Sequence, residues 1–186
     1  MKGTAPSADP RAVFESPLGP LAASFNGEAV VSLGFDAHAE PTPAPELTAP
    51  AKRLCDALIA YFERADDRAF DTLTLAPLGT PFQHRVWATL RDIPFGTTVS
   101  YGRLAESVGS PGAARAVGLA NARNPIAIIV PCHRVVNSKG EPHGYAGGLE
   151  RKRWLLEHES QRRQAEHPRG AQQALFAEGR KDHACS

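Results

Sequence analysis

The chain has 186 residues with a formal net charge of +1, and 42% of the residues are hydrophobic. This is enough for one ordinary domain, or two small ones, with a buried core. No stretch approaches the roughly 20 consecutive apolar residues of a membrane helix, and residues 1–10 lack the apolar centre of a signal peptide. We therefore expect a soluble, cytoplasmic protein that makes no contact with a membrane.

The cysteines and the charges narrow the possibilities further. Cys55, Cys132 and Cys185 are odd in number and far apart, which argues against a disulfide framework, and no Cys-x-x-Cys pair indicates a zinc site. Because the net charge is small, any surface for nucleic acid must be local. One acidic residue stands among basic ones between positions 95 and 140: Arg103, Glu106, Arg115, Arg123, Arg134 and Lys139. A solvated basic face would also explain that segment.

The first predicted unit is an α+β domain over residues 11–77, preceded by a loosely ordered tail at 1–10. Turn signals, among them Asn26-Gly27, separate three strand-like stretches: residues 13–16, 21–25 and 30–35. Asn-Gly between such stretches indicates a hairpin. We therefore expect a small antiparallel sheet.

A helix and a fourth strand are predicted to complete this unit. After a proline-rich loop, Leu54, Leu58 and Tyr61 are spaced as on one face of a helix over 51–64. Over residues 71–75 leucines alternate with threonines, which is typical of a strand.

The second predicted unit, residues 78–160, is mainly helical and is followed by a loosely ordered tail at 161–186. Its first helix has a clear start, because Thr80 can cap it, Pro81 suits its first position and Gln83 completes a capping box. Apolar residues then recur four apart at Phe82, Val86 and Leu90. This spacing predicts an amphipathic helix.

Two short helices are expected next. Ser100 can cap a helix over 101–108, which Gly109 stops, and Ser110-Pro111 starts a second helix that runs to about Arg123. Two short helices joined by a tight turn make a helix-turn-helix. The second domain is therefore predicted to be winged-helix-like.

The second of these helices is the one that would enter a DNA groove, and it carries Arg115 and Arg123. Its small residues would let it approach a DNA backbone closely: Ala113, Ala114, Ala116 and Gly118. A helix pair that serves packing alone is the alternative.

A reactive centre is predicted at Pro131-Cys132-His133-Arg134, directly after an apolar run at 126–130 that should be buried. Free cysteine is only a few per cent thiolate at neutral pH, so a nucleophile needs a base or a cation nearby. His133 is the candidate base, acting through a bridging water, and a carboxylate should orient its ring. An inert buried cysteine is the alternative.

These segments resemble a known family. The chain is similar to the O6-alkylguanine-DNA alkyltransferases, also called methylated-DNA:protein-cysteine methyltransferases, in three segments. These are Pro131 to Val136, Ser100-Tyr101 and the run Ala113 to Gly118. The resemblance covers about residues 80–159; the N-terminal half is similar only in layout. It implies repair by direct reversal: an alkyl group moves irreversibly, once per molecule, from O6-alkylguanine to a cysteine. Reaction with O4-alkylthymine is left open at this point.

The resemblance also implies roles for residues of the centre. Cys132 would accept the alkyl group, His133 would deprotonate it through water, and Glu159 would orient His133. Asn124 would brace the turn beside the cysteine, and Tyr101 would donate a proton toward guanine as the alkyl group leaves.

Further roles concern the partner, double-stranded DNA containing O6-alkylguanine. Arg115 would fill the gap left when the damaged nucleotide is turned out, with the helix in the minor groove. The remaining implied DNA contacts are Ala114, Arg123 and Arg134, and the implied pocket residues are Val135, Tyr145 and Ala146. Some relatives carry serine at the position of Ala146, which leaves only backbone contacts there. We expect a monomer without metal or cofactor.

Two other functions remain open at this point. A helix-turn-helix protein could bind DNA without reacting, with Cys132 structural. A cysteine hydrolase could use Cys132 and His133 for acyl transfer, although it would leave Arg115 and the helix pair without a role.

Overall fold

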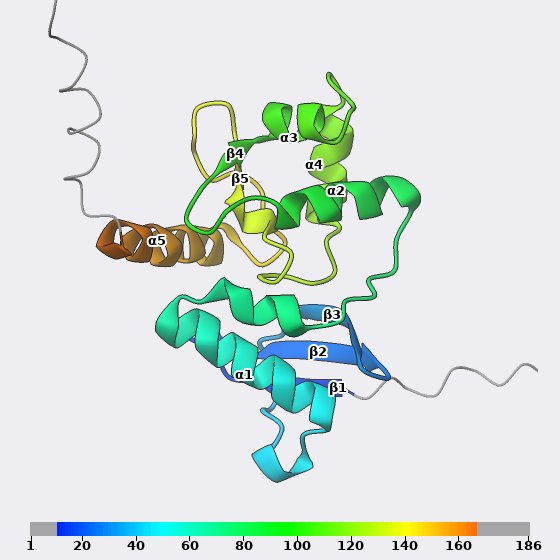
Figure 1. Ribbon diagram of the computed structural model, residues 1–186, viewed down its shortest axis with the longest axis vertical. Coiled ribbons are helices and arrows are strands. Elements are labelled where there is room, and N and C mark those ends of the chain that lie inside the picture. Colours follow the sequence, from blue (N-terminus) through cyan, green and yellow to red (C-terminus); the bar gives the residue numbers. More distant parts are fainter. Residues whose placement is uncertain (1–10, 167–186) are drawn as a thin grey trace, which may run out of the picture.

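A computed structural model of the protein describes residues 11–166 (Figure 1). The predicted tail at 1–10 and residues 167–186 of the predicted C-terminal tail lie outside the described residues. The last helix, α5 (Leu149–Glu166), extends beyond residue 160, after which the tail was predicted to begin. Residues 161–166, which were assigned to the tail, are therefore helical.

The N-terminal half is built on a three-stranded antiparallel sheet in the order β1-β2-β3. Its strands are β1 (Arg11–Phe14), β2 (Leu21–Asn26) and β3 (Ala29–Phe35). Burial alternates along β2, as in a strand with one face on a core. Gly27 has φ +58°, the left-handed conformation that the predicted Asn-Gly hairpin needs. Helix α1 (Ala49–Arg64) packs beside this sheet in the lower part of Figure 1.

The predicted fourth strand is wrong. Residues Asp67–Thr72 form a short 3-10 helix, η2, because the Asp66 side chain accepts a hydrogen bond from the Arg68 backbone and Phe70 is buried. A second 3-10 helix, η1, spans Ala44–Glu46. Within residues 71–75, strand pairing is limited to a parallel bridge between Val30 and Leu75.

The C-terminal half is mainly helical and occupies the upper part of Figure 1. Helix α2 (Pro81–Arg91) has the predicted capping box: Thr80 accepts from the Gln83 backbone, and the Gln83 side chain accepts from the Thr80 backbone. Helices α3 (Tyr101–Ser107) and α4 (Ala114–Ala122) form the helix-turn-helix. The remaining elements are β4 (Val99–Ser100), η3 (Cys132–Arg134) and β5 (Val135–Val136).

The helix pair differs from expectation at one boundary. Ser100 caps α3 through the Arg103 backbone as predicted, and Gly109 has φ +70° just beyond its end. Helix α4 begins at Ala114 rather than at Ser110-Pro111, because those residues form a turn closed by the Ala113 backbone donating to the Ser110 carbonyl at 3.0 Å.

One buried core joins the two halves. It includes Phe25 and Leu33 of the sheet, Leu54 of α1, Val86 of α2 and Leu155 of α5. The fold is mixed α+β, with a small antiparallel sheet at the N-terminus and helices after it, as predicted. Within residues 11–166 no helix is long and apolar enough to cross a membrane.

Candidate active site

The chain that leads to Cys132 is held in an unusual turn. Ile128 has φ +71°, a conformation that is rare for a β-branched residue and costs of order 1–3 kcal/mol. Asn124 stabilises the turn from inside: its amide nitrogen donates to the Val130 carbonyl at 2.8 Å, and its oxygen accepts from the Ile126 backbone at 3.0 Å. The predicted burial of residues 126–130 is confirmed except at Ala127, which is half-buried.

Cys132 is the first residue of η3, and only 6% of it is exposed. Burial raises the pKa of its thiol, although a hydrogen bond from the Asn124 amide, at 3.1 Å from Sγ, and the charge of Lys152 act in the opposite direction. The group therefore rests as a thiol rather than as a thiolate. A reaction at this sulfur needs a base.

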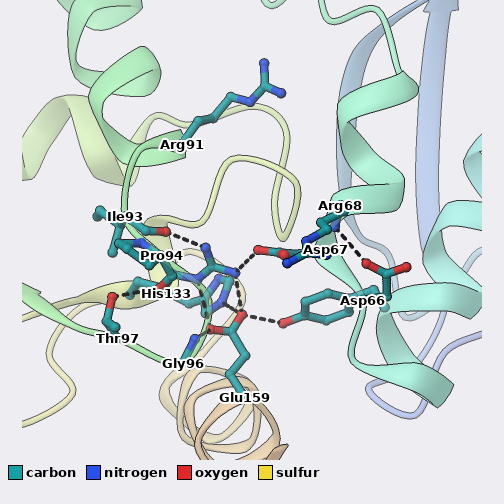
Figure 2. Close-up of polar contacts among 12 residues, drawn as sticks. Asp66, Asp67, Arg68, Arg91, Ile93, Pro94, Gly96, Thr97, His133 and Glu159 are labelled. Atoms are coloured by element: carbon teal, nitrogen blue, oxygen red, sulfur yellow. Dashed lines mark hydrogen bonds and ion pairs between the residues drawn. The ribbon is translucent and has the colours of Figure 1, made fainter. Parts of the chain in front are cut away.

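The neighbouring histidine is positioned as such a base. His133 Nε2 lies 2.8 Å from Glu159 Oε1, and both residues are fully buried (Figure 2). Glu159 also accepts hydrogen bonds from the Gly96 backbone at 3.1 Å and from the Tyr61 hydroxyl at 2.8 Å. Burial alone would raise the pKa of Glu159, but the charges and hydrogen bonds of His133 and Arg134 outweigh it and hold that pKa well below its ordinary value.

This hydrogen-bond pattern sets the histidine tautomer. An ionised carboxylate only accepts hydrogen bonds, so His133 Nε2 carries the proton and Nδ1 has a free lone pair. Nδ1 is buried and has no hydrogen-bond partner among the residues that the structure describes. It is the basic atom of the ring.

The structure corrects the prediction that Arg134 contacts DNA. Arg134 is only 3% exposed, and its guanidinium donates to both Glu159 oxygens at 2.9 and 3.0 Å. It also donates to Asp67 at 2.9 Å and to the Ile93 carbonyl at 2.6 Å, and its charge lies 5.5 Å from the centre of the Phe95 ring. Its donors point inward, so Arg134 braces the reactive centre.

A hollow of about 640 Å³ opens between α3, α4 and the loop at 143–146. It brings together predicted site residues that are far apart in sequence. The lining residues are Tyr101, Ala114, Arg115, Gly118, Asn121, Ala122, His143, Gly144, Tyr145 and Ala146. Cys132 adjoins this hollow through Asn121, whose amide donates to the Cys132 carbonyl at 3.4 Å.

Two tyrosines give the hollow polar groups. Tyr101 donates to the His143 carbonyl at 3.2 Å, and burial, followed by its proximity to Cys132, raises its pKa, so the hydroxyl stays protonated. The Tyr145 hydroxyl is buried without a hydrogen-bond partner among the described residues, as is the Asn121 side-chain oxygen. These atoms can bind a polar ligand that enters the hollow.

Two other predicted residues, Val135 and Arg123, do not line this hollow. Val135 is fully buried in β5, where it pairs with Val99 of β4. It therefore packs behind the hollow and does not form its surface. Arg123 is exposed one residue beyond α4 and is not a lining residue of the hollow.

Sequence reasoning missed a buried lysine. Lys152 is fully buried, and its ammonium donates to the carbonyls of Val135 at 2.6 Å, His143 at 2.8 Å and Gly144 at 3.2 Å. Burial lowers its pKa to about 8. Its hydrogen bonds hold the loop at 143–146 against β5. The sequence could have indicated that Lys152 is buried, because its spacing places it on the same helical face as Leu155 and Glu159.

Within the described range, no group of three or more His, Cys, Asp or Glu residues is arranged to hold a metal ion. The cysteines at 55 and 132 are free. Cys55 is half-buried in α1, away from the hollow.

Comparisons with known proteins point to one family. The family profile "6-O-methylguanine DNA methyltransferase, DNA binding domain" matches residues 81–161. A "Methylated-DNA--protein-cysteine methyltransferase" of Mycobacterium leprae is 50% identical over 148 residues, which cover 77% of this chain and 88% of the relative. A crystal structure of Mycobacterium tuberculosis OGT in complex with DNA is 45% identical with a TM-score of 0.68, covering 82% of this chain and 93% of that one. An O6-methylguanine-DNA methyltransferase from Pyrococcus kodakaraensis is 27% identical with a TM-score of 0.59, covering 80% and 97%.

Proposed function

Because this chain belongs to the methylated-DNA–protein-cysteine methyltransferase family, we propose that Cys132 is the cysteine that receives the alkyl group. The protein is a DNA-binding repair enzyme that transfers an alkyl group irreversibly. The observation that carries the assignment is the buried His133–Glu159 pair, at 2.8 Å, directly after Cys132, whose carbonyl accepts from Asn121, a lining residue of the hollow beside α4.

The base in this proposal acts through water. His133 Nδ1 carries a lone pair and is buried, and a buried polar atom needs a polar partner. A water between Nδ1 and Cys132 Sγ meets that need and passes the thiol proton to the ring. Glu159 stabilises the imidazolium that forms, because its carboxylate is already ionised.

The proposed substrate is O6-alkylguanine in double-stranded DNA. The thiolate attacks the alkyl carbon, the S–C bond forms and the bond from that carbon to O6 breaks. Tyr101 donates its proton to the departing guanine and regains one from the imidazolium through solvent, so one proton leaves the thiol and one arrives on guanine. The thioether on Cys132 has no good leaving group, which makes the protein act once.

The hollow is the proposed site for the base. A nucleotide must leave the duplex stack to reach a buried sulfur, and this costs roughly a few kcal/mol. Arg115 is exposed on α4 at the edge of the hollow, where its side chain can fill the gap in the duplex. Tyr145 and Asn121 offer hydrogen-bonding atoms to the base edge, and Ala146 offers backbone groups.

The setting of the reaction follows from the same site. Every residue named here belongs to one chain, so we infer that a monomer is sufficient. A reaction that needs a free thiol is favoured in a reducing compartment, from which we infer a cytoplasmic location.

The direct test is the intact-protein mass after incubation with a duplex that contains one O6-methylguanine. We expect the mass to rise by one methylene, with peptide mapping placing the addition on Cys132. Cys132→Ser should show no gain. Cys55→Ser, which removes the free thiol of α1, should show the full gain.

Other outcomes would contradict this assignment. Lesion binding without a mass gain would identify a non-catalytic binder. Repeated turnover of an ester or peptide, without transfer from DNA, would identify a hydrolase.

A further inference from the structure

The N-terminal half of the chain has no part in the reaction described so far, yet it contacts the reactive centre at three points. These contacts come from α1, from η2 and from β3. All of them reach residues that hold Cys132, His133 or Glu159 in place.

The first contact is made by Tyr61 of α1. Its hydroxyl donates to Glu159 Oε1 at 2.8 Å, which is the oxygen that also accepts from His133 Nε2. Tyr61 is fully buried, and its ring packs at 5.4 Å from Phe70 and 6.2 Å from Phe95, measured between centroids. Burial and then the charge of Glu159 raise the Tyr61 pKa well above its ordinary value, so the hydroxyl remains a donor.

The second contact runs through Arg134. Asp67 of η2 accepts from the Arg134 guanidinium at 2.9 Å, while the same guanidinium holds Glu159. Figure 2 shows Asp67 on the segment that faces His133 and Glu159. Glu159 is therefore fixed by Tyr61 directly and by Asp67 through an arginine.

The third contact lies on the other side of the thiol. The Leu33 backbone of β3 donates to the Pro125 carbonyl at 2.9 Å, and the Ala127 backbone donates to the Leu33 carbonyl at 2.8 Å. These bonds flank the chain just before Ile128, whose φ of +71° requires support from its surroundings. The sheet thus helps to hold the turn that presents Cys132.

From these contacts we propose that the N-terminal half is a working part of the reactive centre, with Tyr61 as a positioning residue that holds Glu159 in line with His133. The inference rests on the proposed function of Cys132 and His133. A proton relay loses rate steeply when its members move by a fraction of an ångström. A hydrogen bond to an ionised group is strong enough to set such a position.

Tyr61→Phe tests the proposal because it removes one oxygen and keeps the ring in the core. Transfer of the methyl group from duplex O6-methylguanine would be followed in a single turnover, over a range of DNA concentrations. We expect the rate at saturating DNA to fall roughly tenfold, the size of a lost charged hydrogen bond. The DNA concentration at half-saturation should stay unchanged, because Tyr61 is fully buried in α1 and does not line the hollow beside α4.

Phe62→Leu is the matched control. Phe62 neighbours Tyr61 in α1 and packs against it at 5.2 Å between ring centroids, but it makes no hydrogen bond to Glu159. It should lower the melting temperature and leave the saturating rate within twofold of the unmodified chain. Equal rate losses in Tyr61→Phe and Phe62→Leu would reduce Tyr61 to a packing role and overturn the proposal.

A double-variant cycle with Glu159→Gln decides whether Tyr61 acts through Glu159. In the Glu159→Gln background, Tyr61→Phe should lower the rate less than twofold, because no ionised oxygen remains to be positioned. The same tenfold loss in both backgrounds, or no loss in either, would contradict the proposal. Failure of the proposed function is distinguishable, since the unmodified chain itself would then transfer no methyl group.

Discussion

Glu159 holds an ionised carboxylate at a position that water does not reach. The residue is fully buried, and isolated burial of such a charge would be prohibitive. Arg134 offsets that cost with a bidentate contact, and Tyr61, Gly96 and His133 donate the remaining hydrogen bonds. Glu159 thereby links the position of His133 to the stability of the fold.

This link predicts a specific dependence of stability on pH. The pKa of Glu159 in the folded state lies below its ordinary value of 4.5. Its contribution is therefore present above about pH 4.5 and is lost as the pH falls toward the folded-state pKa. Glu159→Gln should lower the free energy of unfolding by about 3–5 kcal/mol at pH 7, since buried Arg134 loses its bidentate partner and keeps only the contact with the partly exposed Asp67.

Urea unfolding at a series of pH values measures this effect. The difference between the unmodified chain and Glu159→Gln should narrow as the pH falls below about 4.5. Glu157→Gln, at an exposed position of the same helix, should change stability by less than about 0.5 kcal/mol at any pH. A difference that stayed constant down to pH 3 would show that Glu159 does not titrate as described.

At the level of the secondary-structure elements, helix α4 has one face that packs against the core and one face that is exposed. Val117 and Ala120 are buried against the core, and the Trp87 indole of α2 donates to the Ala120 carbonyl at 2.9 Å. On the outer face, spacing by four aligns Arg115 with Leu119, an apolar side chain that is 54% exposed. Such a mixed basic and apolar face is typical of helices that enter the minor groove.

Arg115→Ala should impair transfer from a duplex far more than transfer from a single strand. Only in the duplex does turning out a base leave a gap that a side chain must fill. We expect the duplex rate to fall about 10- to 100-fold, the equivalent of a few kcal/mol. The single-strand rate should change less than threefold.

Single-turnover assays on matched duplex and single-stranded oligonucleotides measure both rates. Arg103→Ala is the control, because Arg103 is also an exposed helical arginine but pairs with Glu106 at 2.8 Å and is not a lining residue of the hollow. Its duplex rate should be near that of the unmodified chain. Equal losses on both substrates for Arg115→Ala would rule out the gap-filling role.

The elements also show where local signals fail. The capping box of α2 was predictable because its donors and acceptors lie three residues apart. The fourth strand was not, because alternation over 71–75 also fits a segment in which Leu73 is buried after a 3-10 helix. Burial of Leu73 is compatible with a strand and with a segment that follows a 3-10 helix. The Asp66 cap favours the helix.

For the whole molecule, the shared core predicts one unfolding transition. Residues from the sheet, α1, α2 and α5 belong to the same buried cluster, and the pair Tyr61–Glu159 crosses between the halves. A boundary near residue 77 therefore stays a prediction about layout, and we do not expect the two halves to melt separately.

Scanning calorimetry tests this directly. The calorimetric and van't Hoff enthalpies should agree, as for a two-state transition. Two resolved transitions, or a van't Hoff enthalpy well below the calorimetric one, would mean that the halves fold independently. Tyr61→Phe should lower the single melting temperature without splitting the transition.

Several elements and the Cys132-His133 motif could be predicted from the sequence. Each of these features is formed by a few neighbouring residues, so spacing and residue type suffice to find it. They are the hairpin, the helix caps, the helix pair and the Cys132-His133 motif. Asn124 and Glu159 were placed by the resemblance to a family, and the structure brings them to Cys132 and His133 respectively.

The charged side chains that face inward could be identified only from the folded chain. From the sequence, Arg134 was expected to contact DNA. In the structure it donates instead to Glu159, which lies 25 residues away in the chain. Tyr61 lies 98 residues from Glu159, and no local pattern indicates that pairing. Whether a polar side chain meets solvent or a buried partner depends on which segments the fold brings together, and that is settled when the core closes.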